Sequence, residues 1–202
     1  DGRMVGTIKR SHLVMVLLMG ALFISIVPSA SASDGSEFAG GSGTAGDPYP
    51  IANADQLNHV RTYLHSHFIL IADIDLTTYQ TGEGWEALGA LYSKFEGVFD
   101  GNDYTITGLT IDRASTTFVA LFGYTGSNSA LINVHLRDVN VTGNNHVGGL
   151  AGASEGTITN SSAIGQVTDT QRVGGLVGYI YKGSIDHSYA EVDVEGTNYQ
   201  VG

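Results

Sequence analysis

Short apolar segments recur at nearly constant spacing along the second half of the chain. Val147-Gly-Gly-Leu-Ala-Gly152 returns 26 residues later as Val173-Gly-Gly-Leu-Val-Gly178, and Val201-Gly202 begins a third copy after a further 28 residues. A degenerate copy, Phe118-Val-Ala-Leu-Phe-Gly123, lies 29 residues before the first. Periods of about 20–50 residues are typical of solenoids, in which each unit buries its apolar face against its neighbours. The pattern therefore predicts a stack of coils.

A second set of segments has a similar period, and each segment begins with an aliphatic residue and carries Gly, Asn or His two positions later. These segments are Ile106-x-Gly108, Leu131-x-Asn133, Ile158-x-Asn160 and Ile185-x-His187. Gly and Asn tolerate backbone conformations with positive φ, which turn a strand round a corner, so we expect a bend here in each coil. A third strand is expected at 139–141, 166–167 and 192–194. Three short parallel strands per coil make the predicted fold class an all-β, right-handed parallel β-helix.

The segments before residue 106 do not follow this period. Asn53 or Asp55 is placed to cap a short helix that runs to about Leu64. Strands are expected at 68–76 and 95–99, and Asp100-Gly-Asn-Asp103 is a strong turn signal. We interpret 47–105 as an N-terminal capping region, in which the helix and capping strands close the solenoid. The repeats then occupy 106–202 and are truncated, because they stop two residues into a coil.

The first 46 residues have the composition of export and leader sequences. Lys9-Arg10, an apolar run from Leu13 to Val27 and Ala30-Ser-Ala32 match the three regions of a signal peptide at 1–32. The apolar run has 15 residues, fewer than the roughly 20 that a membrane-spanning helix needs, although an uncleaved anchor is the alternative. Residues 33–46 are rich in Gly and Ser and predict a flexible leader. We expect a secreted or cell-surface protein with no membrane association after cleavage.

The net charge limits the classes of partner, and the cysteine content limits the sources of stability. The formal net charge is −11, and removal of 1–32 makes it −13, because that segment holds three basic residues and one acidic residue. So acidic a surface repels phosphate backbones and anionic headgroups, which excludes nucleic acid as a partner. The chain has no cysteine, so stability must come from hydrogen bonding and side-chain burial.

The Val-Gly-Gly-Leu-x-Gly segments resemble the GLUG repeat of bacterial and archaeal surface proteins. The upstream half resembles the region that often precedes such repeats, in the matching pieces Gly43-Thr-x-x-Asp-Pro-Tyr-x-Ile51, Ala72-Asp-Ile-Asp-Leu76, Gly84-Trp-x-x-Leu-Gly89 and Phe99-Asp-Gly-Asn-x-Tyr-Thr-Ile106. The resemblance implies a large secreted or wall-attached protein, such as an adhesin-like protein or the non-catalytic region of an immunoglobulin A metallopeptidase. It carries over no catalytic residue.

Four carboxylates are the best candidates for chemistry: Asp73, Asp75, Asp100 and Asp103. Parallel β-helix polysaccharide lyases and hydrolases use outer acidic clusters to bind calcium or to act as acid and base. The structural alternative, which we prefer, is that these residues face solvent or shape turns. A metal site at His59, His65 and His67 is disfavoured, because His59 and His65 lie on different faces of a helix. An extended chain from Ser66 onward could bring them to one face, but no third ligand is evident.

Asn133, Asn160 and His187 share one register, and a column of stacked, hydrogen-bonded side chains is the preferred interpretation. We therefore assign no catalytic, cofactor-binding or metal-ligating residue. The leading functional hypothesis is a non-catalytic β-solenoid, adhesin-like or a stalk, that presents loops to an extracellular glycan or protein ligand or to downstream domains of the same polypeptide. The alternative is a carbohydrate-active β-helix enzyme, or an accessory region of a larger secreted enzyme.

Overall fold

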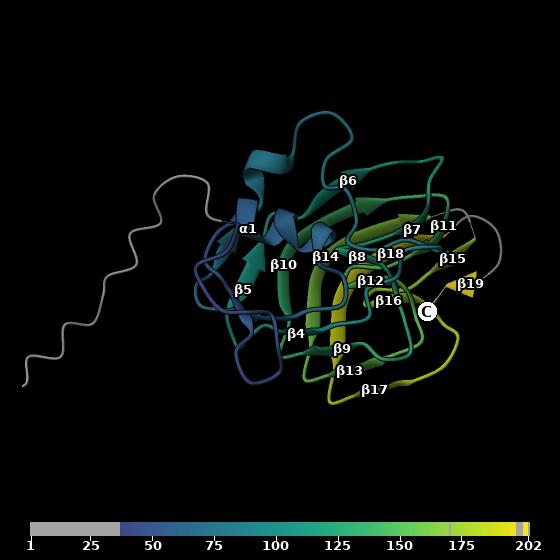
Figure 1. Cartoon of the computed structure of the whole chain (residues 1–202). Helices are drawn as coiled ribbons and strands as arrows, with labels where there is room; N and C mark the ends of the chain where they lie inside the picture. Colours follow the sequence, from purple (N-terminus) through teal and green to yellow (C-terminus); the bar gives the residue numbers. More distant parts are fainter. Residues whose placement is uncertain (1–36, 170, 197–199, 202) are drawn as a thin grey trace, which may run out of the picture. The chain divides into compact units, whose positions relative to one another are not determined.

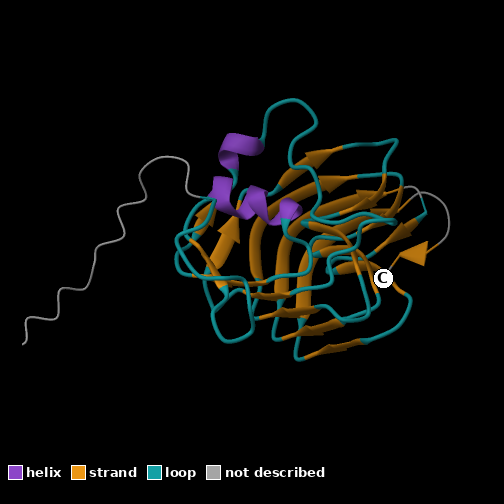
Figure 2. Ribbon diagram, in the orientation of Figure 1, coloured by secondary structure: helices purple, strands orange, loops and turns teal. Residues whose placement is uncertain are grey.

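The fold is a parallel β-solenoid of about five turns with one short α-helix. The computed structural model describes residues 37–169, 171–196 and 200–201 (Figure 1), so the signal peptide predicted at 1–32 lies outside the described residues. Strands stack in parallel on the turns above and below them (Figure 2), which confirms the predicted fold class. Among the described residues, no helix has the length and hydrophobicity needed to cross a bilayer.

Four sheets run along the solenoid. The first contains β1 (Tyr49–Ile51), β2 (His67–Leu70), β4 (Val98–Asp100), β9 (Ala130–Ile132), β13 (Thr157–Thr159) and β17 (Ser184–Asp186). The second contains β3 (Ile74–Asp75), β5 (Thr105–Thr107), β6 (Thr110–Asp112), β10 (His135–Thr142), β14 (Ser162–Asp169) and β18 (Tyr189–Gly196). The third contains β7 (Thr117–Val119), β11 (Asn145–Val147), β15 (Arg172–Val173) and β19 (Gln200–Val201). The fourth contains β8 (Phe122–Thr125), β12 (Ala151–Ser154) and β16 (Val177–Ile180).

One coil therefore holds four strands, such as β11, β12, β13 and β14, where the sequence predicted three. The predicted strand at Val147–Gly152 contains a corner, because β11 ends at Val147 and β12 begins at Ala151. Gly148 and Gly149 form this corner, and a Cβ on Gly148 would lie 2.4 Å from the carbonyl oxygen of Ala151. The predicted second and third strands merge at one end into the eight-residue β14. Apolar spacing alone did not mark these ends.

The last glycine of each motif has a steric reason. Gly123, Gly152 and Gly178 stand in one column, because β8, β12 and β16 pair in register. A Cβ on Gly152 would lie 2.7 Å from the carbonyl oxygen of Gly123 and 2.8 Å from that of His146, closer than Cβ atoms approach backbone. The strand before the corner passes so near this column that only glycine fits.

The predicted bends are confirmed at all four positions. Asn133, Asn160 and His187 have φ of 53°, 50° and 50°, and Gly108 has a φ of 73°. However, the alignment of Ile106 with Leu131 was wrong: Leu131 pairs with Phe99, whereas Ile106 pairs with Leu136 in the second sheet. The coils before residue 106 have different lengths, so a fixed period misaligned them.

The N-terminal half builds further turns and also covers them. Asn53 caps α1 (Ala54–His59), its side chain accepting the N–H of Gln56 at 2.9 Å, and two 3₁₀ turns follow at Val60–Thr62 and Thr77–Tyr79. The predicted strand at 68–76 is divided, since β2 and β3 belong to different sheets. The predicted capping region at 47–105 thus supplies strands to the same stacks as the repeats.

Residues 37–46 differ from the flexible leader that their composition suggested. Phe38 is buried and stacks on Tyr49, with ring centroids 4.4 Å apart. The amide of Ala39 bonds to Pro50, and Gly43 accepts a bond from His67. One buried aromatic side chain and these backbone bonds therefore hold a Gly-rich segment in place. Deeper in the interior lie Phe68, Trp85, Phe95, Phe99 and Phe122, all at most 1% exposed.

Candidate functional site

Two loops project from the regular coil on neighbouring turns. The first lies between Leu88 and Phe95, which pair with Phe122 and Thr125 of the next turn. Phe95 lies seven positions after Leu88, whereas Thr125 lies only three positions after Phe122. The 89–94 loop therefore contains four extra residues. The backbone on both sides is fixed, because Leu88 and Phe95 donate to the carbonyls of Leu121 and Tyr124 at 2.9 Å each. The loop is therefore an outward insertion into an otherwise regular turn.

The second loop connects β6 to β7. Asp112 pairs with Thr142 and Thr117 pairs with Asn145, so this loop contains two more residues than the next turn. A bond from the amide of Thr116 to the carbonyl of Arg113, at 2.8 Å, closes it. Insertions into solenoid turns map to loops on one face, which is often the binding face.

A cavity of about 460 Å³ lies between these loops. It is lined by Glu86, Ala87, Gly89, Ala90, Leu91, Tyr92, Ser93, Ile111, Arg113, Thr116, Thr117, Phe118 and Val119. Leu91 and Tyr92 form the tip of the first loop, a tight turn closed by reciprocal backbone bonds between Ala90 and Ser93 of 2.9 and 3.0 Å. Turn tips favour Gly, Asn and Pro, yet here the side chains of Leu91 and Tyr92 are 41% and 98% exposed. Two large apolar side chains therefore face solvent at the mouth of the cavity.

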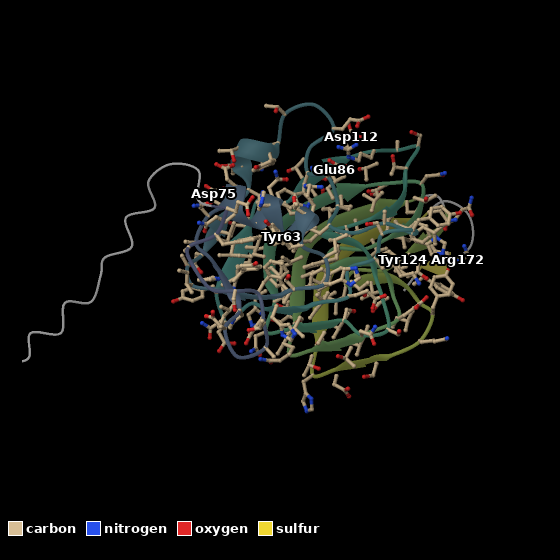
Figure 3. All side chains as sticks on the ribbon, viewed as in Figure 1. Tyr63, Asp75, Glu86, Asp112, Tyr124 and Arg172 are labelled. Carbon is tan, nitrogen blue, oxygen red and sulfur yellow. The ribbon has the colours of Figure 1, made fainter. Side chains whose placement is uncertain are left out.

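Charged side chains hold the base of both loops. Arg61 lies 3.5 Å from the carboxylate of Glu86, donates to its backbone carbonyl at 2.9 Å, and stacks over Trp85. Burial lowers the pKa of Arg61 from its ordinary value, partly offset by Glu86. Arg113 donates to Glu83, and Figure 3 labels Glu86 in the cavity wall and Asp112, the last residue of β6 before the second loop. The carboxylate of Glu86 is exposed and Arg113 lies at the opposite loop, so the walls of the cavity hold one charge of each sign.

The floor of the cavity leads into an aromatic column. Phe118 adopts a φ of 61°, unusual for a bulky residue, and stacks on His146 of the next turn at 4.7 Å. His146 is buried and also contacts Tyr179 and Tyr181. Burial, and then the charge of Arg172, lower the pKa of His146. His146 occupies the equivalent position of the next turn and has a φ of 58°, so this conformation repeats along the solenoid.

The four candidate aspartates do not form one cluster: Asp73 and Asp75 line a surface cavity together with Asp55, whereas Asp100 and Asp103 do not line it. Asp73 accepts the amide of Thr105, Asp75 that of Thr77 and Asp100 that of Asn102, each at 2.8–2.9 Å. Asp103 lies 3.6 Å from the ring of His135. The hydrogen bond from Thr77 lowers the pKa of Asp75 from its ordinary value. The hydrogen bonds of Asp75 and Asp100 shape turns, and that of Asp73 fastens two neighbouring turns.

The candidate histidines do not form a set of metal ligands. His59 packs against Phe38 and Tyr63 and lies 3.4 Å from Glu37, whereas His65 is exposed. Across residues 37–169, 171–196 and 200–201, no group of three or more His, Cys, Asp or Glu side chains is placed to hold a metal ion.

The predicted column of polar side chains is present at Asn133 and Asn160 and continues to Asp100. Asn160 donates its side-chain amide to Asn133 at 2.7 Å, and Asn133 donates to Asp100 at 3.1 Å. The amide hydrogen bonds link three turns along the corner of the solenoid. Sequence reasoning found this column from its period, but it missed the cavity, since no motif marks which residues of the first turns pair.

The family was identified by comparison with known proteins. The model of the GLUG motif matches residues 143–168 and 169–195. The chain is a GLUG-motif protein. Each match covers one complete turn from the end of β10 onward, so the cavity lies outside the two GLUG turns.

Two curated relatives place this GLUG-motif protein among larger chains. One, named as a Gly-rich membrane protein of Evansella cellulosilytica, is 41% identical over 145 residues. The other, halomucin of Haloquadratum walsbyi, is 34% identical over 149 residues. The aligned regions are 68% and 69% of this chain, but only 17% and 2% of those relatives. A crystal structure of a Bacteroides ovatus protein, named as an immunoglobulin A1 protease, matches 80% of this chain and 71% of its own at 20% identity and a TM-score of 0.53, which shows the shared fold.

Proposed function

We propose that this chain is a non-catalytic β-solenoid module of a secreted or cell-surface protein, and that it presents its two loop insertions to an extracellular partner. The exposed Leu91–Tyr92 tip beside the 460 Å³ cavity carries the proposal. Leu91 and Tyr92 are adjacent and also line the cavity, so their exposed apolar surface is continuous with a concave site, and this combination favours an interaction site. A rigid stack of turns is a suitable support for loops of this kind.

The surface location is supported by the relatives, one named as a membrane protein and the other as halomucin. An adhesin-like role joins this location to the exposed loops, and a plain stalk is the less favoured version because it gives the insertions no role. A non-catalytic role is supported by Asp73, Asp75 and Asp100, since each already accepts a backbone amide and a general acid or base needs a carboxylate directed at substrate.

The matched deletion for this proposal follows from the register. Removing residues 90–93 leaves Leu88-Gly89-Lys94-Phe95, the same length as Phe122-Gly123-Tyr124-Thr125 in the next turn. The deletion therefore replaces the insertion with a regular turn. We expect the variant to keep the circular dichroism spectrum and to lose binding.

The assay displays the chain on beads and measures their adhesion to surfaces coated with extracellular polysaccharides or matrix proteins. Wild-type beads should adhere to at least one coating, and beads carrying the 90–93 deletion should not. Equal adhesion by both, or none by either, contradicts the proposal. Release of new reducing ends or unsaturated sugars from the polysaccharides would instead establish the enzyme alternative.

A further inference from the structure

We infer that the cavity between the two insertions binds a neutral glycan, with the ring of Tyr92 as its stacking platform. This inference rests on the proposed function and names the chemical class of its ligand. The cavity volume of about 460 Å³ lies within the range of roughly 300–1,000 Å³ that small-ligand sites occupy. The lining also combines apolar surface with a few polar groups, the composition of such sites.

The ring of Tyr92 is suited to the C–H face of a pyranose. It is 98% exposed, so both its faces are open at the mouth of the cavity, and no neighbouring side chain competes for them. The turn that carries it is closed by two backbone bonds, which limits the cost of ordering the backbone on binding. Leu91 beside it and Phe118 within the cavity extend the apolar surface.

The polar groups around this surface match hydroxyls rather than a single strong charge. Ser93, Thr116 and Thr117 carry hydroxyls that both donate and accept, as sugar hydroxyls do. The exposed carboxylate of Glu86 adds an acceptor for adjacent hydroxyls, and the guanidinium of Arg113 adds a donor. Arg113 donates from Nη1 to Glu83 and its Nε is buried, so Nη2 is the group left for a ligand.

Charge favours an uncharged sugar over a uronate or sulfated one. The chain carries a net charge of −11, which repels polyanions. Glu86 is paired with Arg61 and Arg113 with Glu83, so the cavity offers no unpaired cation to an anionic ligand. A neutral glycan meets neither repulsion nor an unmatched charge.

The test uses the whole chain and neutral trisaccharides as probes: cellotriose, maltotriose, mannotriose and chitotriose, with trigalacturonate as the anionic comparison. Titration calorimetry gives affinity, and saturation-transfer NMR reports whether sugar C–H protons contact the protein. Tyr92→Ala removes the ring, whereas Tyr92→Phe keeps it. Tyr189→Ala, in β18 at the far end of the described solenoid, is the matched control, because Tyr189 is also an exposed tyrosine.

At least one neutral trisaccharide should bind, with a tenfold or greater loss in Tyr92→Ala, less than threefold in Tyr92→Phe and none in Tyr189→Ala. No heat and no saturation transfer from any neutral trisaccharide would overturn the inference, as would equal affinity of Tyr92→Ala. Binding of trigalacturonate or of a protein that requires Tyr92 would overturn it too, yet would leave the proposed function standing. If the variant with the 90–93 deletion also adheres like wild type, the glycan inference and the proposed function are both contradicted.

Discussion

Substitution of one motif glycine tests the packing of the repeats. Gly152 lies in β12, with backbone conformation open to any residue, so only space limits substitution there. In Gly152→Ala the new Cβ would lie 2.7 Å from the oxygen of Gly123, 2.7 Å from the carbonyl carbon of Phe118 and 2.8 Å from the oxygen of His146. All three are backbone atoms of neighbouring strands, which cannot move aside singly.

The expected cost follows from this crowding. Overpacking by a methyl group in a rigid site destabilises by about 1–3 kcal/mol. In a domain of this size that lowers the melting temperature by roughly 2–12 °C. The loss works against a gain of about 0.4–1 kcal/mol that Gly→Ala gives by restricting the unfolded chain. Gly152→Ala is therefore less stable than wild type only if the steric cost exceeds the gain from the unfolded chain.

Gly46→Ala is the matched control, because a Cβ there meets nothing within 4 Å and Gly46 has no positive φ. It should be unchanged or slightly more stable than wild type. The assay is guanidinium unfolding followed by far-UV circular dichroism, with all variants compared at equal slope. If Gly152→Ala proved as stable as Gly46→Ala, the steric account of the motif glycine would be refuted.

Three further predictions concern the corner, a buried ring and the core. Asn160→Ala should destabilise by about 1–2 kcal/mol, because Ala disfavours positive φ, while Asn160→Gly should cost less, and equal losses in thermal unfolding would contradict this reason. The pKa of His146 is lowered in the folded state, so protonation of its ring opposes folding. The folding stability should be full above about pH 6.5 and decrease as the pH falls from there through the folded pKa. His146→Phe should reduce this loss in melting scans from pH 7.5 to 5. Phe122→Ala should cost about 3–5 kcal/mol in guanidinium unfolding, since its ring is fully buried against Phe95 and Phe99; a loss below 1 kcal/mol would show that the core relaxes.

The repeats were predictable because identical residues in successive turns stack on themselves. A period of 26 to 28 residues translates directly into pairing, and Asn at the corner gives the sign of φ. The number of strands per turn was not predictable from apolar spacing. Gly148 and Gly149 have no side chains, so nothing in the alternation marks where β11 ends and β12 begins.

The cavity was hidden for a different reason. Its insertions are visible only once Leu88 is known to pair with Phe122 and Asp112 with Thr142, and those pairs share no repeated motif. The misplaced alignment of Ile106 has the same origin. Phe38 illustrates the converse case, where composition favoured a loose chain and one buried ring fixed it.

The return of the backbone to an equivalent position after each complete turn has an evolutionary consequence. Thr142 pairs with Thr168, and Thr168 pairs with Glu195 of the following turn. If one whole turn is removed or duplicated, Thr142 therefore meets a residue at the same position of a turn, and the strands can pair in the same register. Loss of a single residue would instead exchange inward and outward side chains until the next corner. Genes for such proteins can therefore lengthen by unequal recombination, each added turn extending the molecule by about 4.8 Å while its outer loops diverge independently.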